Sequence, residues 1–279
     1  MISFPKGMSM KEFQLEGKTA MVTGAGRGIG KAIALILAEA GAQIIAAART
    51  KEEIEETASE VRKMGRTCLP IPTDVTSASD VARLVDAALS EFGRIDILIN
   101  QAGRGGGRKP LVPLPGYAPP GSKDSPDFFT PLSEEMWHSV MDTNLTSMFL
   151  CARAVGPQMI QQKKGKIVNM SSFVGAKGFP NQLVYSTSKA AVSMFTRCLA
   201  LEWARYQINV NAIGPGYVRT AMTEGLLQNE KMRESLLTSV PLRRFCEPRE
   251  VGLLALYLAC EASDYLTGQT IYLDGGLLA

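Results

Sequence analysis

Tyr185 and Lys189 are the residues of this chain whose types and spacing best suit proton chemistry. They lie four residues apart, so on a helix the phenol and the ammonium group project from the same face. A tyrosine hydroxyl has an unperturbed pKa of about 10, and it serves as an acid or base near neutrality only where a positive charge stabilises its anion. We therefore expect Lys189 to lower the pKa of Tyr185. The spacing alone is weak support, because roughly one chain in three of this composition holds such a pair by chance.

A glycine-rich turn near the N-terminus predicts a phosphate-binding site. Residues 23–30 read TGAGRGIG, after a predicted strand and ahead of an apolar helical stretch. Glycines permit a tight strand-to-helix turn and let backbone N–H groups approach a pyrophosphate, and the helix N-terminus adds partial positive charge. A turn that serves packing alone is the alternative. The residues expected to bind the cofactor here are Gly24, Arg27, Gly28, Ile29 and Gly30.

The end of the second predicted strand bears on which dinucleotide binds. An acid that binds the ribose is expected about 20 residues beyond such a turn, but the chain has Ala48 followed by Arg49. Two guanidiniums, Arg27 and Arg49, can hold a 2′-phosphate through charge-assisted bonds, whereas an aspartate would repel it. The pattern favours NADP, with NAD as the alternative. An ordinary solvated arginine that pairs with Glu52 or Glu53 is the other interpretation of Arg49.

Short β-branched runs alternate with helical stretches from residue 18 onward, which indicates a parallel sheet covered on both faces. We predict an α/β fold of the Rossmann type, with a doubly wound parallel sheet in a single domain over residues 1–279. The expected strands are 19–23, 43–48, 95–99, 166–170, 208–213 and 270–273.

Two segments depart from this alternation. Residues 104–131 hold three consecutive glycines and seven prolines, which predicts a long Gly/Pro-rich insertion beside the site. Its cations Arg104, Arg108 and Lys109 could attract an anionic substrate, and a solvated loop or a subunit contact is the alternative. Residues 220–240 resemble a substrate-binding lid, with an apolar inner face formed by Met222, Leu226 and Leu227.

Polar residues follow several predicted strands, at the edge where open α/β sheets bind ligands. Asn100 to Gly103 follow the strand at 95–99, Ser171 and Ser172 follow the strand at 166–170, and Gly214 to Gly216 follow the strand at 208–213. With Tyr185 and Lys189 on the next helix, the chain resembles a short-chain dehydrogenase/reductase. The resemblance covers residues 15–276 and is to the cytosolic type that includes 3-oxoacyl reductases and gluconate dehydrogenases.

The resemblance implies roles for individual residues. Gln101 and Gly26 depart from it, since many relatives have asparagine and serine at those positions. Asp74 has a second interpretation, as the N-cap of the following helix. The implied catalytic tetrad is Asn144, Ser172, Tyr185 and Lys189. The further residues implied to bind the cofactor are Asp74, Val75, Asn100, Ala102, Gly103, Tyr185, Lys189, Pro215, Gly216, Val218 and Thr220.

The reaction implied is hydride transfer between the nicotinamide of NADP(H) and a secondary alcohol or carbonyl substrate, with Tyr185 as general acid and base. Ser172 would orient the substrate oxygen, and Asn144 would fix a bend in its helix. The alternatives are a noncatalytic dinucleotide-sensing protein on the same fold and an NAD-dependent dehydrogenase of a polyol or hydroxy acid. An epimerase, a dehydratase or an enoyl reductase usually shows different glycine or tyrosine-to-lysine spacing.

Composition restricts the partners. The 279 residues carry 30 basic and 27 acidic side chains for a net charge of +3, without a basic tail, so no nucleic-acid partner is expected. Five widely spaced cysteines and one histidine offer no metal site. The chain shows no signal peptide and no apolar run long enough for a membrane span, which predicts a cytoplasmic protein acting on a small molecule. The resemblance implies a homotetramer.

Overall fold

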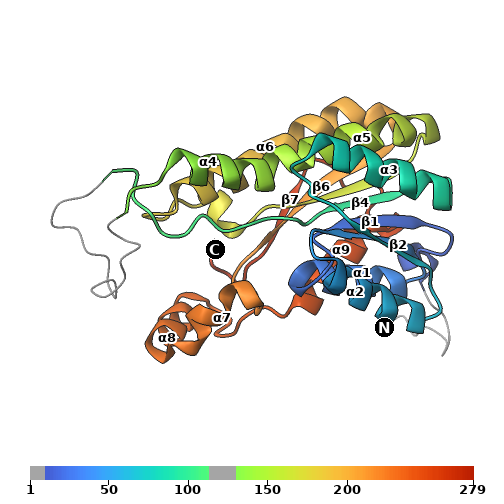
Figure 1. Cartoon of the computed structure of the whole chain (residues 1–279). Coiled ribbons are helices and arrows are strands. Elements are labelled where there is room, and N and C mark those ends of the chain that lie inside the picture. Colours follow the sequence, from blue (N-terminus) through green and yellow to red (C-terminus); the bar gives the residue numbers. More distant parts are fainter. Residues whose placement is uncertain (1–9, 113–129) are drawn as a thin grey trace.

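The structure, a computed structural model, describes residues 10–112 and 130–279. In these residues one seven-stranded sheet has the order β3-β2-β1-β4-β5-β6-β7, and all its neighbouring strands are parallel (Figure 1). This confirms the Rossmann-type doubly wound sheet predicted from the alternating pattern. The strands are β1 Thr19–Thr23, β2 Gln43–Ala48, β3 Cys68–Pro72, β4 Ile97–Asn100, β5 Gly165–Met170, β6 Ile208–Pro215 and β7 Thr270–Leu273.

The sequence-based strand predictions differ from the structure in four places, the smallest being that β5 begins one residue earlier than predicted, at Gly165. Strand β3 was missed because Pro70 and Pro72 argue against a strand, yet proline is tolerated on an edge strand and β3 lies at the sheet edge. Strand β4 begins and ends later than expected and includes Asn100. Strand β6 continues through Pro215, which pairs with Leu273 of β7, so this proline lies within the sheet.

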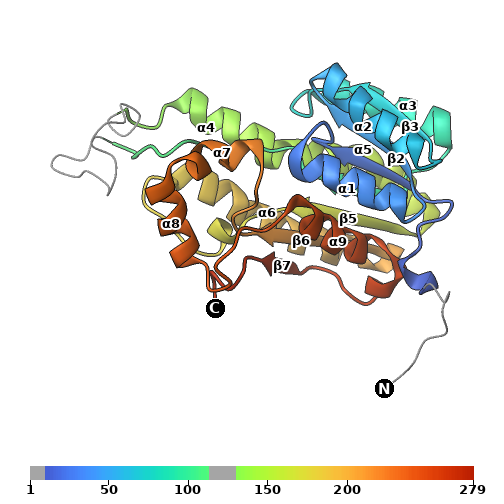
Figure 2. The ribbon, with the colours of Figure 1, turned by 90° about the horizontal axis from the view of Figure 1, so that it is seen from below.

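Helices cover both faces of the sheet. In Figures 1 and 2, α1 and α9 lie on one face and α3, α5 and α6 lie on the other. Two clusters of buried apolar side chains fill the two interfaces, the first around Ile33 and Leu258 and the second around Leu84 and Val155. The helices are α1 Gly28–Glu39, α2 Lys51–Lys63, α3 Ala78–Phe92, α4 Glu134–Met141, α5 Ser147–Gln162, α6 Leu183–Trp203, α7 Ala221–Gln228, α8 Glu230–Ser239 and α9 Pro248–Ala259.

The strand order identifies the edge of the sheet at which a ligand is expected to bind. The connections run in opposite directions from β1 and β4, and ligands of open α/β sheets bind at the carboxyl ends of such a strand pair. The Thr23 hydroxyl joins these two ends, because it donates to the Ile99 carbonyl at 3.2 Å and accepts from the N–H groups of Gln101 and Ala102, both at 3.1 Å. The glycine turn after β1 and the turn after β4 are therefore held side by side.

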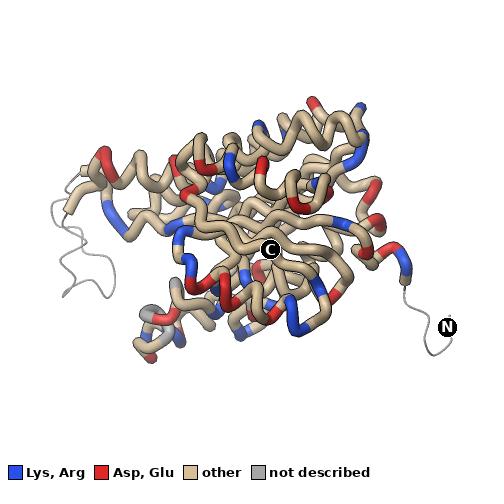
Figure 3. The backbone as a smooth tube through the Cα atoms, turned by 45° about the vertical axis from the view of Figure 1, so that its right-hand side comes forward, with Lys and Arg blue, Asp and Glu red and all other residues tan. Residues whose placement is uncertain are grey.

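The predicted lid consists of the short helices α7 and α8, which lie apart from the main helical layers after β6 (Figure 1). The side chains of Met222, Leu226 and Leu227 and the insertion residues 113–129 lie outside the described part. All five cysteines are free. Basic and acidic residues are interspersed over the molecule (Figure 3). No helix within residues 10–112 and 130–279 is long and apolar enough to cross a membrane.

Candidate active site

Ser172, Tyr185 and Lys189 lie together at the carboxyl end of β5. Ser172 follows that strand and caps a short 3₁₀ turn over Phe173–Gly175, while the other two residues project from the first two turns of α6. The Ser172 side chain lies near enough to the Tyr185 hydroxyl to influence its pKa. The Lys189 ammonium donates to the Met170 carbonyl at 2.8 Å and lies 5.7 Å from the centroid of the Tyr185 ring. The structure therefore brings together three of the four predicted catalytic side chains around one phenol.

The pKa of Tyr185 is raised, which differs from the expectation drawn from its spacing to Lys189. Burial raises the pKa because it disfavours the phenolate, and the nearby Ser172 side chain acts in the opposite direction. Lys189 is not among the causes of the shift. In the chain by itself the cost of removing the phenolate from water exceeds the stabilisation that its neighbours provide. A lowered pKa in the presence of a bound cationic nicotinamide, whose charge would add to that of Lys189, stays a prediction.

Lys189 is a buried amine, with only 4% of its side chain exposed. Burial lowers the pKa of this group to about 8 from its ordinary value of 10.5. The folded state therefore releases this proton near pH 8 while the unfolded chain keeps it to higher pH. Because the unfolded state then binds more protons, the free energy of unfolding should rise with pH in this window, by up to about 1.4 kcal/mol per pH unit.

We predict that Lys189→Met removes this rise between pH 8 and 10. The measurement is urea unfolding of the wild type and the variant at several pH values, with the difference between the two profiles isolating Lys189. Lys231→Met, at an exposed position of α8, is the matched control and should run parallel to the wild type. Parallel profiles for Lys189→Met and the wild type would contradict the lowered pKa.

Asn144 is fully buried in a π-helical segment, Asp142–Thr146, which joins α4 and α5. Its side-chain oxygen accepts from the Arg104 N–H at 2.8 Å, and its amide donates to the Arg104 carbonyl and to the Ser188 hydroxyl, both at 3.0 Å. A Cβ placed on Gly103 would lie 3.2 Å from the Asn144 oxygen and 3.6 Å from the Lys189 ammonium. Asn144 thus ties the start of the insertion to the tyrosine helix, and the whole predicted tetrad is clustered.

The glycine turn is shaped by close backbone contacts. A Cβ on Gly30 would lie 2.0 Å from the Gly24 carbonyl oxygen, and a Cβ on Gly24 would lie 3.0 Å from the Ala102 Cα. Gly24 and Gly28 both have positive φ, a conformation that glycine adopts without strain. A Cβ on Gly28 would lie 3.5 Å from the Thr220 methyl group, so this turn faces the start of the lid.

The first turn of α1 suits an anion. It contains no acidic residue, and the side chain of its N-cap residue, Arg27, makes no capping hydrogen bond. The backbone N–H groups at the start of this helix are therefore available to phosphate oxygens, and the helix dipole favours negative charge there. Ile29 is partly buried and packs against the adjoining core.

Arg27 and Arg49 both lie near carboxylates. The Arg27 guanidinium is 3.5 Å from the Glu53 carboxylate, whereas the exposed Arg49 contributes to lowering the pKa of Asp74. The hydrogen bonds of Asp74 to the Thr76 hydroxyl and N–H, at 2.7 and 3.0 Å, are the larger causes of that shift. Arg49 and Asp74 are therefore neighbours at the ends of β2 and β3, and a 2′-phosphate at Arg27 would compete with Glu53.

Two predicted cofactor residues have clear structural roles. The Asn100 amide donates to the Asn169 side chain at 2.9 Å and thereby joins β4 to β5. Asp74 is not the N-cap of α3, because Ser77 caps that helix by accepting from the Asp80 N–H. The remaining predicted residues lie at the same edge: Val75, Pro215 and Val218 are buried, and Gly216 and Thr220 are partly buried.

Sequence reasoning missed Ser188, and it placed Ser171 at the ligand-binding edge without giving it a role. Ser188 accepts from Asn144 and donates to the Tyr185 carbonyl at 2.7 Å. The Ser171 hydroxyl donates to the Lys189 carbonyl at 2.8 Å, so each of these serines orients a residue of the site. Ser188 lies three residues after Tyr185, on the same helix face, which is the signal that would have identified it.

Comparisons with known proteins agree with this geometry. A family model described as "Enoyl-(Acyl carrier protein) reductase" matches residues 24–278. The chain is 38% identical to the 3-oxoacyl-[acyl-carrier-protein] reductase FabG of Thermotoga maritima, over 95% of this chain and 99% of that protein. It is 37% identical to the 2-dehydro-3-deoxy-D-gluconate 5-dehydrogenase of Dickeya dadantii, over 98% of this chain and the full length of that protein.

Solved structures show the same likeness. The crystal structure of a short-chain type dehydrogenase/reductase from Mycobacterium marinum superposes with a TM-score of 0.82 at 38% identity, covering 97% of this chain and 99% of that one. Fold, site and sequence agree along nearly the whole chain. The chain therefore belongs to the short-chain dehydrogenase/reductase family of NAD(P)-dependent oxidoreductases.

Proposed function

We propose that the chain transfers a hydride between NADP(H) and a secondary alcohol or carbonyl substrate, with Tyr185 as general acid and base. The observation that carries this proposal is that Ser172, Tyr185 and the buried Lys189 ammonium lie together at the carboxyl end of β5, with Asn144 bonded to the helix that carries Tyr185. Two hydroxyl groups that face each other can both bind one substrate oxygen. A general acid or base must lie within hydrogen-bonding reach of that oxygen.

The chain's own residues fit a nicotinamide dinucleotide. The first turn of α1 offers N–H donors and holds no acidic residue, which suits a pyrophosphate, although the Glu53 carboxylate lies beside Gly26 and Arg27. We expect Gly103, Pro215, Gly216 and Thr220 to contact the remainder of the dinucleotide, because Gly103 lies near the Lys189 ammonium and Thr220 faces Gly28. When bound, the nicotinamide supplies or accepts the hydride.

The protein residues move the proton. In reduction, the Tyr185 hydroxyl donates its proton to the carbonyl oxygen, and in oxidation its anion accepts the hydroxyl proton of the alcohol. Ser172 donates a hydrogen bond to the same oxygen and orients it. With a pKa of about 8, Lys189 is mostly protonated at neutral pH, so its positive charge is available to stabilise the tyrosine anion. Asn144 acts as a positioning residue through Arg104 and Ser188.

We further propose NADP in preference to NAD. Arg27 and Arg49 supply two guanidiniums at the adenosine end, and the end of β2 carries no acid to repel a 2′-phosphate. Glu53 weakens the contribution of Arg27 because the two already form an ion pair. Arg49 is therefore expected to be the more important contact with the 2′-phosphate.

A homotetramer is part of the same proposal. Helices α5 and α6 expose apolar side chains on the outer face of the molecule, with Phe149 45%, Met194 54% and Leu201 83% exposed. Apolar residues on adjoining helices are suited to contact with further copies of the chain. Light scattering coupled to size-exclusion chromatography would measure the oligomeric state, and a monomer at micromolar concentration would contradict it.

Turnover distinguishes this function from a noncatalytic dinucleotide sensor. The names of the relatives suggest two substrate classes to test, namely 3-oxoacyl thioesters on a carrier protein and sugar acids. We expect oxidation of NADPH or reduction of NADP⁺, followed by absorbance, with at least one member of a panel of carbonyls and alcohols that includes both classes. Tight dinucleotide binding without turnover on the whole panel would instead favour the sensor.

A further inference from the structure

Three segments around Tyr185 contain basic residues and no acidic ones. They are residues 101–112 after β4, 171–189 after β5 and 214–223 at the end of β6. At the average acidic content of the chain, 27 of 279 residues, segments of this combined length would hold about four carboxylates. The surroundings of the site therefore carry a local excess of positive charge that the overall charge of +3 does not reveal.

Direct contacts bring these segments together. A Cβ on Gly106 would lie 2.6 Å from a Val184 methyl group and 3.7 Å from the Tyr185 Cβ. The Lys109 N–H donates to the Asn181 carbonyl at 2.9 Å. The rings of Phe173 and Tyr217 pack edge to face at a centroid distance of 5.1 Å. The main chain on both sides of Arg108 is therefore fixed, because Gly106 lies against the helix that carries Tyr185 and Lys109 is bonded to the loop before that helix.

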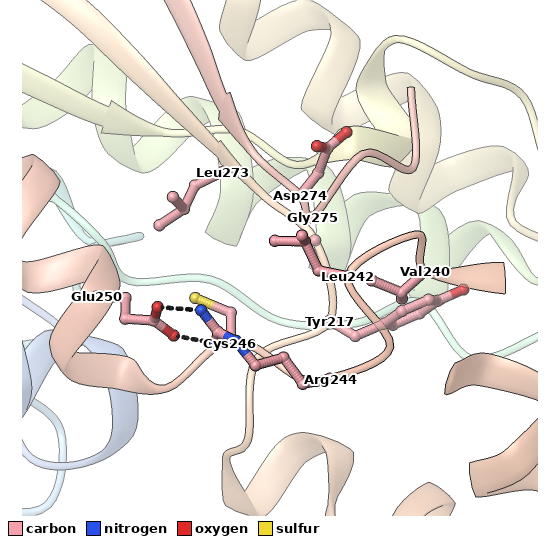
Figure 4. A pocket seen from close by; sticks show the side chains of 10 residues that line it. Tyr217, Val240, Leu242, Arg244, Cys246, Glu250, Leu273, Asp274 and Gly275 are labelled. Atoms are coloured by element: carbon pink, nitrogen blue, oxygen red, sulfur yellow. Dashed lines mark hydrogen bonds and ion pairs between the residues drawn. The ribbon is translucent and has the colours of Figure 1, made fainter. Parts of the chain in front are cut away.

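Most cations near the site are already occupied. Arg104 bonds the Ser139 hydroxyl, Arg219 pairs with Glu247, and Lys189 donates to a backbone carbonyl. A recess of about 50 Å³ is lined by Tyr217, Val240 and Arg244 among others. Figure 4 shows these side chains, and the two terminal guanidinium nitrogens of Arg244 bond the Glu250 carboxylate, both at 2.7 Å. Arg244 is therefore neutralised within this recess.

Arg108 differs from these residues. It is partly buried, and no carboxylate within residues 10–112 and 130–279 forms an ion pair with it. Its charge acts on Tyr217, whose pKa is raised by burial and lowered in part by Arg108 and by a hydrogen bond to Ser239. A partly buried guanidinium without a carboxylate partner is a costly arrangement unless an anion binds to it.

We infer that Arg108 binds an anionic group of the substrate, a carboxylate or a phosphate, at the end of the molecule away from the reacting carbon. The inference rests on the proposed function, because it takes the substrate oxygen to lie between Ser172 and Tyr185. The planar guanidinium fork matches both oxyanions through two parallel N–H···O bonds. The ring of Phe173, the residue that follows Ser172, packs against the ring of Tyr217, on which the charge of Arg108 acts.

A small acid fits this arrangement better than a carrier protein does. An acidic carrier protein would be attracted by charges spread over an exposed surface. Arg108 is instead partly enclosed, and its main-chain neighbours at 106 and 109 are fixed to the tyrosine helix and its loop. A single, partly enclosed guanidinium is suited to bind one charged group of a small ligand that enters the site.

Three six-carbon probes with the same backbone test the inference: neutral D-glucitol, D-gluconate with a carboxylate, and D-glucitol 6-phosphate with a phosphate. Binding is measured by calorimetry on the protein saturated with NADP⁺, and turnover is measured in parallel. The variants are Arg108→Gln and Arg108→Lys. The matched control is Arg205→Gln, which removes the same charge from an exposed residue at the opposite edge of the sheet, ahead of β6.

We expect the wild type to bind at least one of the two anions about tenfold or more tightly than glucitol, and Arg108→Gln to remove that difference. Arg108→Lys should restore part of it, and Arg205→Gln should leave it intact. The anion that depends on Arg108 identifies the group as carboxylate or phosphate. Arg108-dependent binding without turnover would support the inference while contradicting hydride transfer on that probe.

Two results would overturn it. One is an equal effect of Arg108→Gln on glucitol and on both anions, which would indicate a structural role for the residue. The other concerns the same variant: Arg108→Gln would discriminate among the three probes as the wild type does, yet reduce a 3-oxoacyl thioester on an acidic carrier protein more slowly. That result would assign Arg108 to the docking of a macromolecule.

Discussion

Replacement of Tyr185 by phenylalanine is expected to lower kcat by about 10³-fold or more while the dissociation constant of the dinucleotide stays within a few-fold of wild type. The substitution removes only the hydroxyl, so the ring keeps its place beside the Lys189 ammonium. The substrate oxygen then has no proton donor in reduction and no acceptor in oxidation. Stopped-flow or steady-state absorbance of the reduced nicotinamide measures the first quantity, and fluorescence titration measures the second.

The control for this substitution is Tyr265→Phe, which deletes the same hydroxyl from a fully exposed ring. It should leave kcat unchanged. Retention of more than about a tenth of the wild-type kcat in Tyr185→Phe would show that another group transfers the proton. Simultaneous loss of dinucleotide binding would point to a collapsed site instead, and circular dichroism of the variant separates these cases.

The raised pKa of Tyr185 should make the pH dependence of alcohol oxidation differ from that of carbonyl reduction. Carbonyl reduction needs the protonated phenol, which burial favours, whereas alcohol oxidation needs the phenolate. We therefore expect kcat/KM for oxidation to increase through the alkaline range while kcat/KM for reduction stays nearly flat at neutral pH. Identical pH profiles in both directions would contradict Tyr185 as the shared acid and base.

Local patterns predicted most of the fold because they reflect local physics. The alternation of β-branched runs and apolar helices reports burial of a parallel sheet on both faces, and the glycine turn reports a backbone geometry that few residues allow. The edge strand β3 escaped prediction since its prolines are unfavourable in a central strand and acceptable only where one side stays unpaired. That position in the sheet depends on the strand order, which the local pattern does not contain.

The site was predictable in its residues and not in its energetics. Spacing placed Tyr185 and Lys189 on one helix face, but the sign of the tyrosine pKa shift depends on how completely the surrounding chain excludes water. Ser188 and the ion pair of Arg27 with Glu53 depend on the mutual placement of segments that are distant in sequence. Tertiary packing decides such contacts, and no run of a few residues encodes them.

Replacement of Arg49 by aspartate is expected to lower the ratio of kcat/KM for NADPH to that for NADH by about 100-fold. The change removes a guanidinium that can bond the 2′-phosphate and introduces a charge that repels it. It also sets a second carboxylate near Asp74, whose pKa is lowered in part by Arg49. Since a ribose diol donates hydrogen bonds to a carboxylate without repulsion, kcat/KM for NADH should fall little or rise.

Two further variants separate the contributions to this change. Arg49→Gln removes the attraction without adding repulsion, so its ratio should fall between those of the wild type and Arg49→Asp. Glu53→Gln removes the carboxylate that lies 3.5 Å from the Arg27 guanidinium. The preference for NADPH should then rise by a few-fold, because the 2′-phosphate no longer has to displace Glu53 from Arg27. If Arg49→Asp leaves the ratio unchanged while Glu53→Gln raises it, Arg27 alone reads the 2′-phosphate. If neither variant changes the ratio, Arg27 and Arg49 do not distinguish NADPH from NADH. That result would contradict the proposed preference for NADP.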